Sequence, residues 1–223
     1  FVGVLYFDGQ GFMVPRDSGL MSTLELGGNR ICAVADSTGP DNARRYFARH
    51  RMELKLETFQ TEGAARAAYL DGQCDALTTD QSQLHSVRGG LADPRAHRIL
   101  PEIISKEPLS PAVRKGDARW LDVVRWTLFT VIDAEELGIG SANVERAAEQ
   151  ARSEEARLLL DLDGSSAKLL DLEPGWSQRA IKQVGNYAEI FDRNLGAQSP
   201  LKIKRGLNAL WNDGGLLYAP PAR

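Results

Sequence analysis

The run Ile31-Cys32-Ala33-Val34-Ala35 passes directly into the polar turn Asp36-Ser37-Thr38-Gly39. A second run, Asp75-Ala76-Leu77, passes in the same way into Thr78-Thr79-Asp80. Each is a short apolar segment followed by a helical pattern, which is typical of strands in an open α/β sheet. The carboxyl ends of such strands meet at one edge of the sheet, where ligands bind. The two turns are therefore predicted to lie side by side at a ligand site.

The two turns suit opposite charges. Ser37, Thr38 and Gly39 place hydroxyl and backbone N–H groups at the expected start of a helix, and this position favours an anion. Thr79 and Asp80 bring a carboxylate, which favours a cation. Together they complement a zwitterion, of which an amino acid is the simplest. The alternative is local, because Ser37, Thr38 and Asp80 are also ordinary residues for capping the helices that follow.

Composition narrows the function classes. The 223 residues are 43% hydrophobic and 26% charged, which is ordinary for a soluble globular protein of one large or two small domains. The net charge of -3 gives no reason to expect nucleic acid or an anionic membrane as a partner. No apolar run approaches the roughly 20 residues that cross a bilayer.

The pattern along the chain predicts an α/β region followed by a helical region. Residues 1–15 are expected to be extended. Between residues 22 and 105 strands alternate with helices, which indicates βαβ units on a parallel sheet. The strands are predicted at 31–35, 53–59, 75–79 and 97–100, and the helices at 40–50, 62–71 and 80–89, the second capped by Thr61.

The rest of the chain is expected to be mainly helical. Asp117 is predicted to cap a helix over 118–137 that is apolar on most sides, so other elements must cover it. Further helices are predicted over 142–160, 176–193 and 201–212, with a loop at 161–166.

The cysteines leave two possibilities open. Cys32 and Cys74 lie on or beside strand segments that could be neighbours, which would bring them within disulfide distance. Otherwise they are two buried free thiols, as in cytosolic proteins. No Cys/His set suits zinc and no nucleophile–base constellation is present, so no metal, no cofactor and no enzymatic activity are predicted.

Several segments carry a resemblance that is specific in combination: Tyr6-Phe7-Asp8-Gly9-Gln10-Gly11-Phe12, Cys74-Asp75, Thr78-Thr79-Asp80-Gln81-Ser82, the stretch from Leu100 to Pro108, Gly185-Asn186-Tyr187, Glu189-Ile190-Phe191 and the stretch from Gly206 to Asn212. Over essentially its whole length the chain resembles the periplasmic substrate-binding proteins of polar amino-acid ABC transporters, most closely the general L-amino-acid-binding subgroup.

The resemblance implies an α/β fold of the type II periplasmic-binding-protein kind. Residues 1–21 correspond to a remnant of lobe 1 with the first hinge strand, 22–105 to a complete βαβ lobe 2, and 106–223 to the helical C-terminal part of an incomplete lobe 1 with a tail. The implied function is amino-acid binding in the periplasm for uptake by ABC permease membrane subunits. The alternative is a truncated, non-transporting relative that acts as an oligomeric, sensing or vestigial protein.

The resemblance also implies roles for individual residues. The turn at Ser37-Thr38-Gly39 would help to hold the α-carboxylate and Asp80 would take the α-ammonium. The subgroup usually has Gly-Thr-Thr where this chain has Asp36-Ser37-Thr38, and the charge of Asp36 would weaken binding unless that residue points away as a helix cap. An exported family also favours the Cys32–Cys74 disulfide over free thiols.

Family members carry further sequence before the position of Phe1, including an arginine that clamps the ligand carboxylate, and no residue here matches it. Weakened affinity is therefore expected, and the side chain of the ligand is left unpredicted. Helix 118–137 would present an apolar face to water, which predicts a homodimer that exchanges C-terminal helices. The competing outcome is a tail that folds back over that helix.

Overall fold

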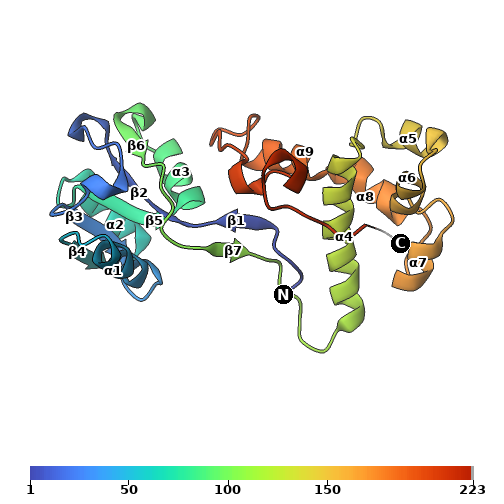
Figure 1. Cartoon of the computed structure of the whole chain (residues 1–223), viewed down its shortest axis with the longest axis horizontal. Helices are drawn as coiled ribbons and strands as arrows, with labels where there is room; N and C mark the ends of the chain where they lie inside the picture. Colours follow the sequence, from blue (N-terminus) through green and yellow to red (C-terminus); the bar gives the residue numbers. More distant parts are fainter. Residues whose placement is uncertain (222–223) are drawn as a thin grey trace. The chain divides into compact units, whose positions relative to one another are not determined.

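The chain forms two compact units in a computed structural model that describes residues 1–221. Unit 1 comprises Phe1–Phe7 and the chain from Leu109 onward, and unit 2 comprises Asp8–Pro108. Strands β1 (Tyr6–Asp8) and β7 (Glu107–Leu109) pair with each other and contain both points at which the chain passes between the units. Figure 1 labels the elements of each unit.

Unit 2 contains a five-stranded sheet in the order β4-β3-β5-β2-β6. Its strands are β2 (Gln10–Pro15), β3 (Arg30–Val34), β4 (Lys55–Phe59), β5 (Ala76–Asp80) and β6 (His97–Ile99). β3 is parallel to both β4 and β5, whereas β2 is antiparallel to both β5 and β6. The four strands predicted from βαβ alternation therefore run in one direction. The expectation of a purely parallel sheet is wrong, because β2 inserts in the opposite direction.

Helices cover both faces of this sheet, as Figure 1 shows. They are α1 (Gly39–Arg49), α2 (Glu62–Leu70) and α3 (Gln81–Gly89), with 3-10 turns at Arg16–Ser18, Thr23–Glu25 and Pro94–Ala96. Successive strand residues point to opposite faces. Accordingly, Phe12 and Ile31 pack in one core with Phe47 of α1, and Met13 and Cys32 pack in another with residues of α2 and α3. Thr61 caps α2 as predicted.

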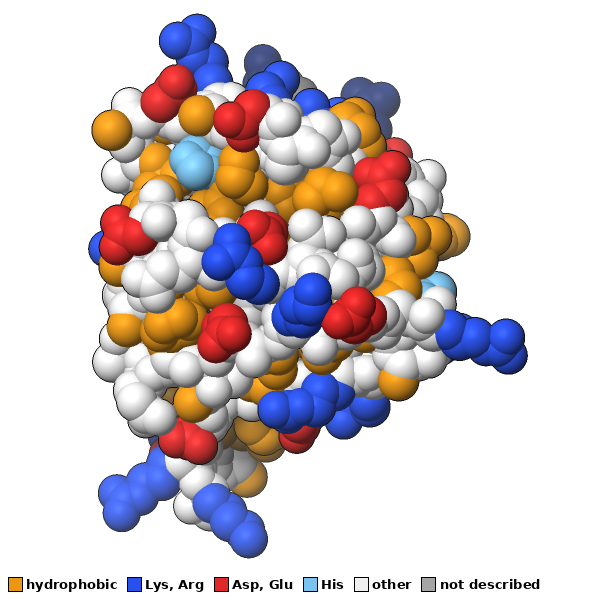
Figure 2. All heavy atoms as spheres, turned by 90° about the vertical axis from the view of Figure 1, so that its left-hand side faces the viewer, with side chains coloured by type: hydrophobic (Ala, Val, Ile, Leu, Met, Phe, Trp, Pro, Cys, Tyr) orange, Lys and Arg blue, Asp and Glu red, His pale blue; other side chains and the backbone are white. Residues whose placement is uncertain are grey.

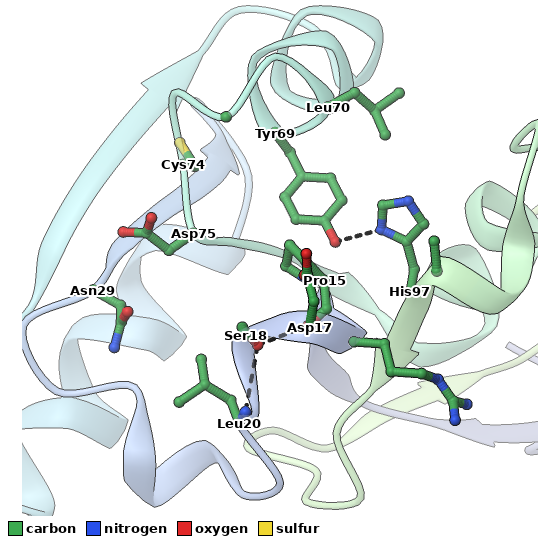
Figure 3. Close-up of a pocket in the computed structure, with 13 residues that line it drawn as sticks. Pro15, Asp17, Ser18, Leu20, Asn29, Tyr69, Leu70, Cys74, Asp75 and His97 are labelled. Atoms are coloured by element: carbon green, nitrogen blue, oxygen red, sulfur yellow. Dashed lines mark hydrogen bonds between the residues drawn. The ribbon is translucent and has the colours of Figure 1, made fainter.

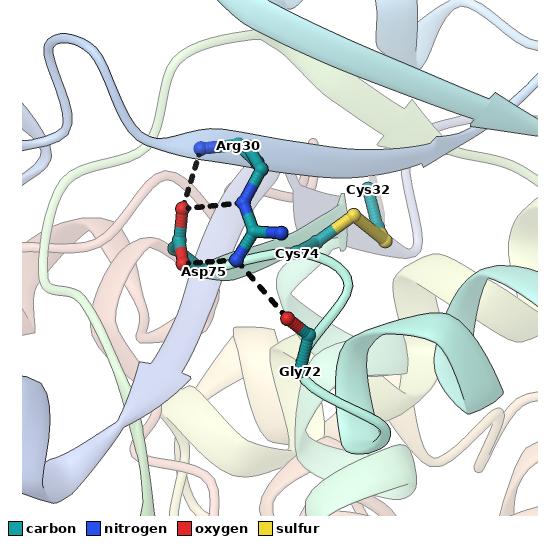
Figure 4. The surroundings of a disulfide bond; sticks show 5 residues. All are labelled: Arg30, Cys32, Gly72, Cys74 and Asp75. Carbon is teal, nitrogen blue, oxygen red and sulfur yellow. Dashed lines mark hydrogen bonds and ion pairs between the residues drawn. A yellow bond between two sulfur atoms is a disulfide. The ribbon is translucent and has the colours of Figure 1, made fainter.

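The predicted disulfide between Cys32 and Cys74 is present, with Cα atoms 5.6 Å apart and both residues buried (Figure 4). It ties β3 to the segment just before β5. Beside it, the Asp75 carboxylate accepts hydrogen bonds from the Arg30 backbone at 2.8 Å and from its guanidinium at 2.9 Å. These hydrogen bonds hold the pKa of Asp75 below its usual value. The disulfide and the ion pair thus fasten the amino ends of the two strands to each other.

Unit 1 is helical. Its helices are α4 (Ala118–Glu136), α5 (Val144–Gln150), α6 (Glu154–Leu159), α7 (Ser165–Leu170), α8 (Trp176–Val184) and α9 (Tyr187–Asn194), followed by 3-10 turns at Gly206–Asn208 and Trp211–Asp213. Asp117 caps α4 as predicted, because its carboxylate accepts from the backbone of Trp120 at 2.9 Å.

The C-terminal half of α4 is buried within unit 1. Leu128 and Val131 share a core with Phe191 of α9 and with Leu210 and Leu217 of the C-terminal segment. That segment therefore covers part of the apolar helix face within one chain. The other end of the helix is more open, since Trp120 is 54% exposed.

Two of the predicted long helices are broken by caps. The helix expected over 142–160 divides into α5 and α6 because Ser153 starts a new helix by accepting from the backbone of Ala156 at 3.2 Å. The helix expected over 176–193 ends before Gly185, whose φ of 83° favours glycine. Asn186 and Glu189 then form a capping box that starts α9.

Two further expectations about unit 1 are wrong. The loop predicted at 161–166 already contains the start of α7, because the buried carboxylate of Asp161 accepts from the backbone of Ser166 and Ala167. The helix predicted over 201–212 is replaced by two 3-10 turns, with Ala209 in an extended conformation between them. At the start of the chain, only Tyr6–Asp8 and Gln10–Pro15 of residues 1–15 form strands.

The surface agrees with the composition. On the face drawn in Figure 2, Lys and Arg side chains alternate with Asp and Glu, and neither sign of charge dominates. Within residues 1–221, no helix combines the length and the apolar character that crossing a membrane requires.

Removing the disulfide is expected to destabilise unit 2. The bond closes a loop with a sequence separation of 42, and opening a loop of this length lowers the free energy of unfolding by about 3–4 kcal/mol. Denaturant unfolding of the oxidised protein and of the Cys32→Ala/Cys74→Ala variant, followed by circular dichroism, measures the difference. Tryptophan fluorescence is an internal control, since all four tryptophans lie in unit 1. Equal unfolding midpoints, or two titratable thiols in the unreduced protein, would contradict the expectation.

Candidate ligand-binding site at the strand ends of unit 2

The structure brings the two predicted turns together at one edge of the sheet. β3 and β5 are adjacent and parallel, with Ile31 opposite Ala76 and Cys32 opposite Leu77. Their carboxyl ends therefore lie side by side. The turn from Asp36 to Gly39 follows β3, and Asp80 is the last residue of β5.

In the first turn, Ser37 and Thr38 have different roles. The Ser37 hydroxyl donates to the carbonyl of Val34 at 2.8 Å and accepts from the backbone of Gly39 at 3.3 Å. Thr38 occupies the N-cap position of α1, but its side chain makes no capping hydrogen bond and is exposed. Ser37 therefore shapes the turn, and the Thr38 hydroxyl is available to a ligand at the start of an 11-residue helix.

Asp36 has a positive φ of 44°. Glycine adopts this left-handed region without the steric penalty that a Cβ brings. The residue is exposed and lies two positions before the N-cap, so it is not the capping residue of α1. The backbone conformation thus gives a physical reason for a glycine at this position and places a negative charge near the expected carboxylate site.

Asp80 is the central charge of the second turn. It occupies the N-cap position of α3, yet its carboxylate forms no capping hydrogen bond, so capping does not explain it. The group is half-buried, and this burial raises its pKa, with further contributions from the negative charges of Asp8 and Glu107. A carboxylate in this situation is stabilised by an incoming cation.

Thr79 points the other way. Because side chains alternate along a strand, Thr79 lies on the opposite face of the sheet from Asp80. Its hydroxyl donates to the Gln83 side chain of α3. At the ligand edge, Thr79 therefore presents its main chain rather than its hydroxyl.

One residue that connects the two turns was missed in the sequence. Gln10 of β2 is 1% exposed, and its amide nitrogen donates to the carbonyl of Gly39 at 3.0 Å and to the Thr78 hydroxyl at 2.8 Å. A polar residue between Gly9 and Gly11 in an otherwise apolar strand was an available signal. The contact itself depends on β2 lying beside β5, which local pattern does not reveal.

A hollow of about 730 Å³ lies at the opposite edge of the same sheet (Figure 3). Pro15, Asp17 and Ser18 line one side of it, and a hydrogen bond of 2.7 Å joins the Tyr69 hydroxyl to Nδ1 of His97. Burial raises the pKa of Tyr69 and lowers that of His97. Ligands of parallel α/β sheets bind at the carboxyl ends of the strands, and this hollow lies beyond the amino ends of β3 and β5. Within residues 1–221, no group of His, Cys, Asp and Glu is arranged to hold a metal ion.

Three relatives place the chain in a family. It is 48% identical over 224 residues to the general L-amino acid-binding periplasmic protein AapJ of Rhizobium johnstonii, covering 100% of this chain and 66% of the relative. It is 43% identical over 223 residues to the glutamate/glutamine/aspartate/asparagine-binding protein BztA of Rhodobacter capsulatus, with 100% and 66% covered. A solved ABC transporter periplasmic binding protein from Brucella ovis, with glutathione bound, superimposes with a TM-score of 0.92 at 49% identity, covering 100% of this chain and 70% of that one.

The chain belongs to the family of periplasmic binding proteins of amino-acid ABC transporters. No protein-family model matches it. The chain spans about two thirds of the length of AapJ and BztA. The predicted type II periplasmic-binding-protein fold is confirmed, and the relatives are binding proteins rather than enzymes, as the sequence predicted.

Replacing Asp80 by Asn is expected to stabilise the ligand-free protein. Because the folded-state pKa of Asp80 is raised, the folded state binds more protons than the unfolded state between the two pKa values, and stability falls as the pH rises through that window. Asp80→Asn removes the charge, so we expect a gain of about 0.5 kcal/mol near pH 7, since solvent screens a half-buried charge. The gain should vanish at about pH 2.5, where Asp80 is protonated in both the folded and the unfolded state.

Thermal unfolding of the wild type and of Asp80→Asn at the two pH values measures this difference. Glu149→Gln, which removes an exposed carboxylate in unit 1, is the matched control and should change stability little at either pH. A loss of stability in Asp80→Asn near pH 7 would show that the carboxylate has a structural role.

Proposed function

We propose that this chain binds L-amino acids through their α-ammonium and α-carboxylate groups. Ser37, Thr38 and Gly39 receive the carboxylate at the start of α1, and Asp80 receives the ammonium, with the main chain of Thr79 beside it. The observation that carries the proposal is the half-buried Asp80 carboxylate, which caps no helix and lies at the same sheet edge as the Thr38 hydroxyl. A carboxylate and a helix start at one edge complement a zwitterion.

The relatives support recognition of this common head group. AapJ is named for L-amino acids in general and BztA for four acidic and amide amino acids, and the Brucella ovis protein holds glutathione. The γ-glutamyl end of glutathione carries a free α-ammonium and α-carboxylate on one carbon. All these ligands therefore share the group that the two turns complement, and differ in what is attached to it.

The affinity of this chain is proposed to be weak. The groups of the turn from Asp36 to Gly39 that would meet the carboxylate are the Thr38 hydroxyl and backbone N–H groups, which are uncharged donors. A charge-assisted contact to a carboxylate is about twice as strong as a neutral one, so its absence lowers affinity. The exposed charge of Asp36 acts in the same direction.

The cellular role proposed for the chain is amino-acid capture in the periplasm for an ABC permease. The disulfide supports an oxidising compartment. The alternative function is that of a non-transporting relative with an oligomeric, sensing or vestigial role. Dependence of amino-acid uptake on this chain would separate the two.

Ligand titration tests the binding proposal. L-Glutamine, L-alanine and glutathione are expected to bind and to compete with one another, whereas cysteinylglycine, whose ammonium and carboxylate lie on different residues, should compete much more weakly. Asp80→Asn should weaken L-alanine binding tenfold or more, because a hydrogen bond to a charged group is lost. Ligand-detected NMR or calorimetry gives the affinities. Tight amino-acid binding that is unchanged in Asp80→Asn would contradict the proposal.

Self-association is proposed as well. Trp120, Leu169, Trp211 and Tyr218 of unit 1 are all more than half exposed, and a second copy could cover such side chains. Exchange of the C-terminal helices would reproduce between two copies the contacts that each chain now makes with itself.

Light scattering at micromolar concentration is expected to give twice the 24.5 kDa mass of one chain. Trp120→Glu should shift the equilibrium toward the single chain, because a buried contact would then carry a charge. A stable single chain that binds no hydrophobic dye would show that the tail covers its own helix sufficiently.

A further inference from the structure

We infer that Gln10 is a further ligand-contacting residue of this site, and that its side-chain oxygen accepts a hydrogen bond from the ligand ammonium beside Asp80. The inference rests on the proposed function. Gln10 belongs to β2 and lies outside both turns.

The orientation of the Gln10 amide is determined by its partners. The Thr78 hydroxyl has a single proton, and it donates this proton to the carbonyl of Gly11 at 2.7 Å. Thr78 must therefore accept from Gln10, and only the amide nitrogen can donate. The Gly39 carbonyl oxygen can only accept a hydrogen bond, so the Gln10 atom that lies 3.0 Å from it must also be the amide nitrogen. Both protons of the amide nitrogen are thus used, and the oxygen is assigned without ambiguity.

The amide oxygen of Gln10 accepts no hydrogen bond from residues 1–221. It is not one of the fully enclosed side-chain atoms that lack a partner, so the small exposed area of this residue (1%) leaves the oxygen accessible to a ligand. The oxygen lies 3.9 Å from the position that a Cβ on Gly39 would occupy, so it borders the start of α1.

The sheet register places Gln10 next to Asp80. Gln10 is the direct partner of Asp80 in the β2–β5 pair, and residues that face each other across antiparallel strands share one face of the sheet. The Gln10 oxygen and the Asp80 carboxylate are therefore two acceptors on the same face, adjacent to the anion-binding turn. An ammonium group has three N–H donors and needs more than one acceptor.

A neutral amide suits this position for an electrostatic reason. Asp8 and Glu107 already act on Asp80 as like charges. Another carboxylate at position 10 would increase that repulsion, whereas an amide oxygen accepts a hydrogen bond without adding charge. Gln10 thus completes the coordination of an ammonium at the lowest electrostatic penalty.

The test uses two probes that share the ammonium. L-Alanine has an ammonium and a carboxylate, and L-alaninamide keeps the ammonium but has no carboxylate. Gln10→Met, a substitution of similar size, should weaken binding of L-alaninamide tenfold or more and that of L-alanine at least as much, since Gln10 also bonds Gly39. If Gln10 only supports the Gly39 turn, the loss should be confined to L-alanine, and the inference is overturned.

Thr78 supplies a matched pair of variants. Thr78→Ser keeps the hydroxyl that fixes the amide orientation and should bind both probes like the wild type. Thr78→Val frees the amide to rotate and should weaken binding of both. Equal affinities in the Ser and Val variants would contradict the assigned orientation.

A measurement on the wild type covers the case in which Gln10→Met does not fold. The side-chain amide resonances of ¹⁵N-labelled Gln10 should shift when L-alanine or L-alaninamide is added, and not when propionate is added. No shift with either ammonium probe, while both bind, overturns the inference. Failure of the wild type to bind any amino acid, or insensitivity of binding to Asp80→Asn, is instead a failure of the proposed function.

Discussion

The arrangement of the candidate site depends on the fixed adjacency of β3 and β5. At their amino ends, the Cys32–Cys74 disulfide and the hydrogen bonds between Arg30 and Asp75 join the two strands covalently and electrostatically. At their carboxyl ends, the buried amide of Gln10 bonds both Gly39 and Thr78. A strand slip of one residue would turn every side chain to the other face. Because the strands are fastened at both ends, the turn from Asp36 to Gly39 and Asp80 keep a constant position relative to each other.

The electrostatics of the candidate site reduce the stability of the ligand-free fold. Burial and two like charges raise the pKa of Asp80, and its carboxylate caps no helix. Asp36 holds a backbone conformation that glycine would adopt more easily. Strain and unpaired charge of this kind are typical of functional positions, because a ligand can relieve them.

The main structural requirement in unit 1 is the burial of an apolar helix. A helix as apolar as α4 must be covered, and its C-terminal half shares a core with α9 and with Leu210 and Leu217 from the end of the chain. Residues far apart in sequence are thus brought into one core. The Arg205 guanidinium adds to this arrangement, since it forms hydrogen bonds of 2.9 and 3.0 Å to Glu135 and lies over the rings of Tyr187 and Phe191.

The sequence alone determined what depends on neighbouring residues. Strand ends, the caps at Thr61 and Asp117, and the contrast between an anion-binding and a cation-binding turn all follow from local pattern. Tertiary structure decided what depends on distant residues. The antiparallel insertion of β2 and the contacts of Gln10 arise from pairing between segments about 70 residues apart. The predicted helices ran through Ser153 and Gly185, where the structure starts a new helix and ends one. A serine or a glycine can also lie inside a helix, so these residues do not fix a helix end by themselves, and the packing of the chain decides.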